Sequence, residues 1–113
     1  MDLKSKKKGE IWIVEIDGAI KAGMEFDLAD RLEECMHKSE VPKIIVDMKK
    51  VPFINSAALG IFLNIYKEIE KQNGRFGLCT ISSDVDNLLE ITKLGQILDV
   101  FKNQDDALDS FTD

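Results

Sequence analysis

The sequence predicts an α/β fold in which a mixed, mostly parallel sheet is flanked by helices. Runs of β-branched and aromatic residues alternate with longer runs whose apolar residues recur at helical spacing. The expected element order is β-β-α-β-α-β-α-β-α. Strand–helix–strand connections are right-handed in nearly all proteins and join parallel strands, which is why most of the sheet is expected to be parallel. A length of 113 residues suits one domain, residues 1–113.

Five strands are expected, and four of them are rich in the β-branched and aromatic residues that suit a half-buried sheet surface. Leu3–Lys8 is expected to be a short edge strand, which pairs through a turn at Gly9 with the strand Ile11–Ile16. The other three strands are expected at Lys43–Met48, Arg75–Ile81 and Ile97–Phe101.

Four segments have the apolar spacing of amphipathic helices. The first helix is expected to run from Phe26, taken as an inward-facing residue, to about Lys38. The second and longest helix begins at Ser56 and is expected to end at Asn73-Gly74 through a left-handed cap.

The third and fourth helices are shorter. The third is expected to begin at Ser82 or Ser83, since both are candidate N-caps. It is expected to bury Ile91 and to end at Gly95. The fourth helix is expected at Asp105–Phe111.

The composition indicates a soluble cytoplasmic protein that binds neither nucleic acid nor membrane. The chain is 44% hydrophobic and 32% charged, with a formal net charge of −6. An acidic surface disfavours nucleic acid, because phosphate binding needs basic residues. No segment approaches the roughly 20 apolar residues of a membrane helix, and no signal peptide is recognisable. Cys35 and Cys79 are isolated, which indicates reduced thiols rather than a disulfide.

The sequence does not indicate an enzyme. Catalysis by side chains needs a nucleophile with a nearby base, a metal cluster or a glycine loop that binds phosphate. The one histidine, His37, lies on the polar side of the first predicted helix and is expected to be a solvated surface residue. No catalytic residue, no metal ligand and no cofactor are therefore predicted.

Ser56 is the most informative residue, because it stands between a predicted strand and the long helix. Serine is a common N-cap, since its oxygen accepts a hydrogen bond from an unpaired backbone N–H. A phosphate on the same hydroxyl would face the positive end of the helix dipole and would add about −1.5 to −2 charges to the surface. The small residues Ala57, Ala58 and Gly60 would leave room for a partner. A structural cap and a phosphorylation switch are compatible interpretations.

The segment Ile54-Asn55-Ser56-Ala57-Ala58-Leu59-Gly60 resembles the Asp-Ser-(Ser/Thr/Ala)-Gly-Leu-Gly motif of bacterial anti-sigma factor antagonists, which are STAS-domain proteins. The resemblance extends from about Glu10 to Leu108. It implies that Ser56 is phosphorylated by a serine kinase that is also an anti-sigma factor. It implies further that the unphosphorylated chain binds this kinase, and that a serine phosphatase restores the binding form.

The resemblance also implies a set of partner-binding residues, and two of them depart from the family pattern. The motif's aspartate is Asn55 here, and Lys21 stands where the family often has a second aspartate. These departures leave open an alternative, a STAS docking or scaffold subunit of another signalling complex that does not switch. The implied partner-binding residues are Lys21, Asn55, Ala57, Ala58, Leu59 and Gly60.

Overall fold

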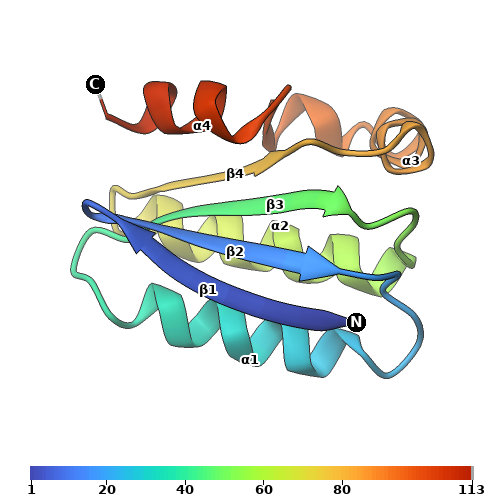
Figure 1. Cartoon of the computed structure of the whole chain (residues 1–113), viewed down its shortest axis with the longest axis horizontal. Coiled ribbons are helices and arrows are strands. Elements are labelled where there is room, and N and C mark those ends of the chain that lie inside the picture. Colours follow the sequence, from blue (N-terminus) through green and yellow to red (C-terminus); the bar gives the residue numbers. More distant parts are fainter. Residues whose placement is uncertain (113) are drawn as a thin grey trace.

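The computed structural model describes residues 1–112, so the last residue of the predicted domain lies outside the described part. It contains a five-stranded sheet with the strand order β1-β2-β3-β4-β5 (Figure 1). β1 is antiparallel to β2, and the other neighbouring pairs are parallel. The predicted α/β fold and element order are confirmed. The strands are β1 (Asp2–Lys8), β2 (Ile11–Asp17), β3 (Lys43–Lys50), β4 (Arg75–Cys79) and β5 (Asp99–Phe101).

The helices lie on both faces of the sheet. α1 and α2 run behind the strands in Figure 1, whereas α4 lies along the side of β4. Buried residues of α1, α2 and α3 form the larger core with one face of the sheet, and α4 forms a smaller core with the other face. The helices are α1 (Glu25–Met36), α2 (Ser56–Lys71), α3 (Ser83–Thr92) and α4 (Gln104–Phe111), with a short 3-10 turn η1 at Leu94–Gln96.

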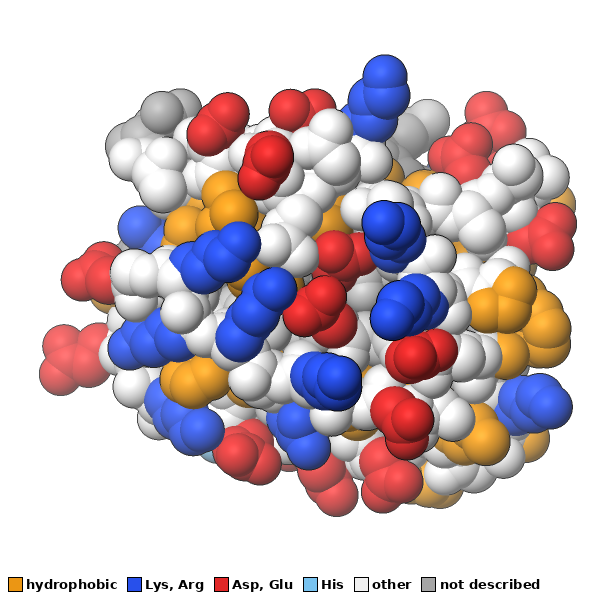
Figure 2. All heavy atoms as spheres, viewed as in Figure 1, with side chains coloured by type: hydrophobic (Ala, Val, Ile, Leu, Met, Phe, Trp, Pro, Cys, Tyr) orange, Lys and Arg blue, Asp and Glu red, His pale blue; other side chains and the backbone are white. Residues whose placement is uncertain are grey.

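The two cores follow from the alternation of side chains along the strands. In β3, Ile44 and Val46 are buried in the larger core, whereas Ile45 is buried in the smaller one. α4 is short, so it covers only part of its face. Figure 2 shows intermixed basic and acidic side chains over the remaining part. Asp47 is buried beside this surface, and its carboxylate accepts hydrogen bonds from the backbone N–H of Lys49 (3.0 Å) and from Gln104 Nε2 (2.9 Å).

Two apolar residues that were expected to face inward are exposed. Phe26 is 70% exposed and Ile91 is 79% exposed, so both predictions are wrong. The physical reason is the helical repeat. Residues two apart on a helix point in nearly opposite directions, and the buried residues Leu28 and Leu89 each lie two positions away.

The long helix is terminated at Asn73-Gly74, as expected, but the two residues differ in their backbone conformation and contacts. Asn73 has the left-handed backbone (φ 59°), whereas Gly74 does not adopt a positive φ. Gly74 donates its N–H to the carbonyl oxygen of Ile69 (3.0 Å). A Cβ at Gly74 would overlap the carbonyl oxygen of Pro42, so glycine is required here by close backbone packing.

The third helix and the strands beside it are shorter than predicted. β4 ends at Cys79 rather than at residue 81, because Thr80 has a left-handed backbone with φ 57°. α3 ends at Thr92 rather than at Gly95, because Lys93 adopts φ 61°. Because residues 94–96 form a 3-10 turn, β5 begins at Asp99 rather than at Ile97.

None of the helices in residues 1–112 combines sufficient length with sufficient apolar character to cross a membrane.

Candidate functional site

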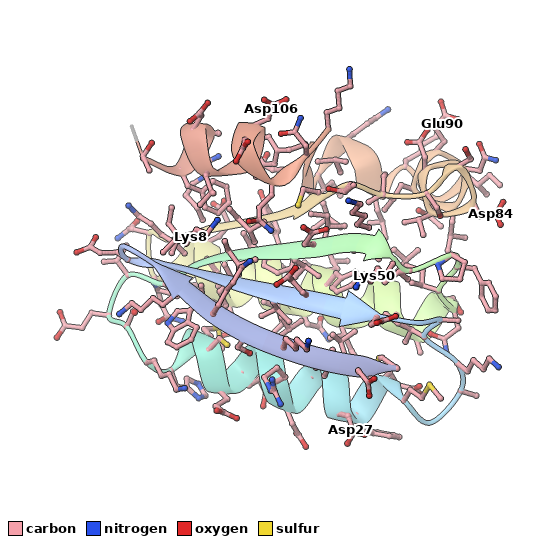
Figure 3. The ribbon with its side chains drawn as sticks, in the orientation of Figure 1. Lys8, Asp27, Lys50, Asp84, Glu90 and Asp106 are labelled. Atoms are coloured by element: carbon pink, nitrogen blue, oxygen red, sulfur yellow. The ribbon has the colours of Figure 1, made fainter. Side chains whose placement is uncertain are left out.

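The candidate site lies at the edge of the sheet where the parallel strands end. Three connections meet this edge: residues 18–24 after β2, residues 51–55 after β3, and residues 80–82 after β4. Figure 3 labels Lys50 at the end of β3 and Asp84 in the first turn of α3, both toward the side of the molecule where α2 begins. In open α/β sheets this edge is the usual place for binding sites.

The 51–55 loop is fixed by backbone hydrogen bonds to the connection that follows β2. Gly18 N–H donates to the carbonyl of Lys50 (2.9 Å), and Ile20 N–H donates to that of Phe53 (3.3 Å). Asn55 N–H donates in turn to the carbonyl of Ile20 (3.2 Å). Ile20 also forms an isolated parallel bridge with Ile54. The 51–55 loop is therefore held in a sheet-like pairing.

Asn55, and not Ser56, is the N-cap of α2. Its backbone is extended (φ −87°, ψ 170°), and its Oδ1 accepts a hydrogen bond from Ala58 N–H (2.9 Å). The prediction of Ser56 as the cap is wrong by one position. The bond from Asn55 N–H to Ile20 keeps residue 55 outside the helix, so Ser56 becomes the first helical residue. Ser56 is exposed to solvent.

This assignment can be tested by replacing the cap. Asn55→Ala is expected to lower the free energy of unfolding by about 1 kcal/mol, because Ala58 N–H loses its acceptor. Asn55→Asp keeps an acceptor and is expected to be at least as stable as the wild type, since a carboxylate is favoured at a helix start. Urea denaturation measures both variants. An equal loss in the two variants would show that residue 55 does not act as the cap.

α2 also differs from the other helices in the charge of its first turn. Within residues 1–112, α1, α3 and α4 each have two acidic residues there, whereas α2 has none. Acidic residues in the first turn offset the positive end of the helix dipole. The positive end of α2 is therefore not compensated by its own first turn.

The predicted partner-binding residues divide into exposed and buried positions. Lys21, Ala57 and Gly60 are exposed, and Asn55 is half-buried. Ala58 and Leu59 are buried, because they lie on the side of α2 that packs against the sheet. Their assignment as partner contacts is corrected, since their side chains are not accessible in this structure.

Phe53 adds an apolar side chain to the exposed positions. The structure places Ile54 in the core and leaves Phe53 47% exposed. Figure 2 shows hydrophobic side chains at the surface on this side of the molecule.

Lys21 lies close to the start of α2 through the backbone pairing. It directly follows Ile20, whose carbonyl oxygen accepts the hydrogen bond of Asn55 N–H. The exposed ammonium group of Lys21 is therefore carried by a segment that is paired with the residues just before Ser56.

The thiols and the histidine lie outside this site. Cys35 and Cys79 are free and buried. Burial raises the pKa of the Cys79 thiol to about 11, which disfavours the reactive thiolate. His37 is exposed at the carboxyl end of α1, so it is remote from the edge where α1 and α2 begin. Among residues 1–112, no cluster of three or more His, Cys, Asp or Glu side chains is arranged to hold a metal ion.

Comparison with protein families assigns the fold that this geometry suggests. A family model described as the STAS domain matches residues 2–107. The chain belongs to the STAS-domain family. The exposed Ser56 at the start of α2 lies within the residues that match this family.

Three relatives illustrate the range of similarity to this STAS domain. The chain is 24% identical over 98 residues to the anti-sigma F factor antagonist of Paenibacillus polymyxa. These aligned residues make up 87% of this chain and 84% of the relative. The crystal structure of a candidate anti-sigma factor antagonist from Thermotoga maritima has a TM-score of 0.90 at 21% identity, covering 98% and 95% of the two chains. The phosphorylated form of the Bacillus cell fate determinant SpoIIAA has a TM-score of 0.75 at 17% identity, covering 96% and 98%.

Proposed function

We propose that this STAS domain is a protein-binding module of the anti-sigma factor antagonist type, switched by phosphorylation of Ser56. The unphosphorylated chain binds an anti-sigma factor that is also a serine kinase, and a serine phosphatase reverses the modification. The chain acts in the cytoplasm and has no enzymatic activity of its own. The observation that carries the proposal is an exposed serine that is free from the capping role, at a helix start without acidic residues.

The charge pattern supports a modification at Ser56. A phosphoserine in the first turn of α2 would interact favourably with the helix dipole, and no acidic residue of that turn would repel it. Lys21 brings a positive charge to the same edge of the sheet. The fold can therefore accept the phosphate, although the surface around Ser56 gains a dianion.

The surface around Ser56 is suited to close contact with another protein. Ala57 and Gly60 are small and exposed, and Phe53 provides an aromatic group of the kind that often anchors an interface. A partner that covers these residues would also cover Ser56. Binding would then require removal of water from the phosphate, which is costly for an unpaired charge. Phosphorylation is thus expected to release the partner.

The relatives support the same type of partner. The protein of Paenibacillus polymyxa is an anti-sigma F factor antagonist, and SpoIIAA is known in a phosphorylated form. We transfer the general role, antagonism of an anti-sigma factor, to this chain. We propose in addition that this anti-sigma factor is a serine kinase and that a serine phosphatase reverses its action on Ser56.

The proposal is tested by treating the purified chain with its cognate anti-sigma factor kinase and ATP. Intact-mass spectrometry is expected to show one added phosphate on the wild type and none on Ser56→Ala. The variant is a suitable control, because Asn55 and not Ser56 provides the helix cap. Phosphate on both proteins, or on neither, would contradict the proposed switch at Ser56.

A second candidate is a STAS docking subunit that does not switch. The neutral Asn55 favours it, because the side chain next to Ser56 is engaged in capping and offers no carboxylate to orient the hydroxyl. This candidate, a docking or scaffold subunit of another signalling complex, predicts binding of its partner without any modification of Ser56. The mass measurement combined with a binding assay separates the two.

A further inference from the structure

The hydroxyl of Ser82 connects two elements that are distant in the sequence. Ser82 is the N-cap of α3, and its Oγ accepts a hydrogen bond from Val85 N–H (3.2 Å). The same hydroxyl donates a hydrogen bond to the carbonyl oxygen of Pro52 (2.9 Å). One side chain thus joins the start of α3 to the 51–55 loop that precedes Ser56.

The segment that carries Ser82 has an uncommon backbone conformation. Thr80 adopts φ 57°, which is rare for a β-branched residue. Its N–H donates to the carbonyl of Phe101 (3.2 Å), so the conformation is held by β5. Such conformations cost on the order of 1–3 kcal/mol and persist only where the surrounding structure enforces them. The strained residue stands two positions before Ser82, directly after β4.

The 51–55 loop is therefore held from two sides by different kinds of contact. On one side, backbone groups of Gly18 and Ile20 bond to the loop and to the end of β3. On the other side, the hydroxyl of Ser82 bonds to Pro52. Proline has no N–H, so its carbonyl oxygen is the only backbone group through which Pro52 can be held by a hydrogen bond.

We propose that Ser82 is a positioning residue, which fixes the 51–55 loop and thereby presents Phe53 and Ser56 to the partner. The consequence for partner affinity rests on the proposed function. The consequence for the loop does not, since it concerns contacts within the chain. Without the bond to Pro52, the loop keeps its pairing with the 18–24 connection and the bond from Val51 N–H to the carbonyl of Met48, and it opens more often.

The two bonds of Ser82 can be separated by substitution. Ser82→Asp retains an acceptor for Val85 N–H, but an ionised carboxylate cannot donate to the carbonyl of Pro52. Ser82→Thr retains both functions and is expected to rescue the wild-type behaviour. Ser83→Asp is the matched control for the added charge. Ser83 is exposed at the next position and makes neither bond.

Hydrogen exchange of backbone amides in the isolated chain is the first measurement. Ser82→Asp is expected to speed exchange of the Ile20 and Asn55 amides by roughly threefold to tenfold, the range for loss of one net hydrogen bond. Val46 in the buried strand β3 exchanges through global unfolding, so the Ile20 and Asn55 amides are expected to stay less protected than Val46 in every variant, as local opening of the loop requires. Ser82→Thr and Ser83→Asp are expected to match the wild type. Unchanged exchange at Ile20 and Asn55 in Ser82→Asp, or exchange at these two amides as slow as at Val46, would overturn the proposal.

Affinity for the anti-sigma factor kinase is the second measurement. Ser82→Asp is expected to bind roughly threefold to tenfold more weakly than Ser83→Asp, because only the former loses the ordered loop. Equal affinity of these two variants would overturn the positioning role in binding. Failure of the wild type to bind any such kinase would instead refute the proposed function, and the exchange result would still decide whether Ser82 orders the loop.

Discussion

Ser56→Asp is expected to weaken binding of the anti-sigma factor kinase by on the order of tenfold to a hundredfold. The substituted carboxylate would lie among Phe53, Ala57 and Gly60, where a partner must exclude water. Burying an uncompensated charge in an interface costs several kcal/mol, and each 1.4 kcal/mol corresponds to about tenfold in affinity. Isothermal titration calorimetry with the unphosphorylated chain as reference measures the effect.

The matched control is Ser56→Ala, which is expected to bind within about threefold of the wild type. Neither variant should unfold the domain. Asn55 provides the cap, and an aspartate in the first turn of α2 is favoured by the helix dipole by about 0.3–1 kcal/mol. If Ser56→Asp and Ser56→Ala bind equally well, the residue does not control docking, and the interpretation as a constitutive docking subunit is favoured.

Gly74→Ala is expected to cause the largest loss of stability among the single substitutions considered, about 3 kcal/mol. The added Cβ would overlap the carbonyl oxygen of Pro42 and press against the side chain of Ile69. That carbonyl also accepts the N–H of Arg75 at the start of β4 (2.9 Å), so it cannot move away without loss of a hydrogen bond. Forcing extra atoms into a packed site typically costs about 1–3 kcal/mol. Chemical denaturation measures the change.

Gly60→Ala is the matched control for this substitution. Gly60 lies within α2, and a Cβ there would meet no atom within 4 Å. Alanine is favoured over glycine in a helix, so the free energy of unfolding is expected to rise by about 0.5–1 kcal/mol. A stabilising effect of Gly74→Ala, or similar effects of both substitutions, would contradict the packing described at the end of α2.

The fold was predictable because periodicity dominates its construction. The alternation of Ile44, Ile45 and Val46 places buried residues on both faces of β3, as a central strand requires. The predictions for Phe26 and Ile91 are wrong because apolar character alone does not determine which side of a helix is buried. Counting from the buried positions Leu28 and Leu89 would have placed both residues on the outer side of their helices.

The details of the site depend on contacts that sequence spacing does not reveal. Asn55 and Ser56 are both favourable N-caps, and the choice between them is made by the pairing of Asn55 with Ile20. The bond between Ser82 and Pro52 joins residues that are 30 positions apart. The capping potential of Ser82 was visible in the sequence, but its second partner was not. The left-handed conformation of Thr80 was not predictable, because this conformation is usually adopted by glycine and position 80 is a threonine.

The central claim is that a phosphate on Ser56 controls partner binding, and one titration tests it most directly. The same purified chain is titrated with its anti-sigma factor kinase before phosphorylation, after complete phosphorylation of Ser56, and after treatment with a serine phosphatase. Binding is expected to weaken at least about tenfold on phosphorylation and to return after dephosphorylation. Identical affinities of the unmodified and phosphorylated chains would contradict the account.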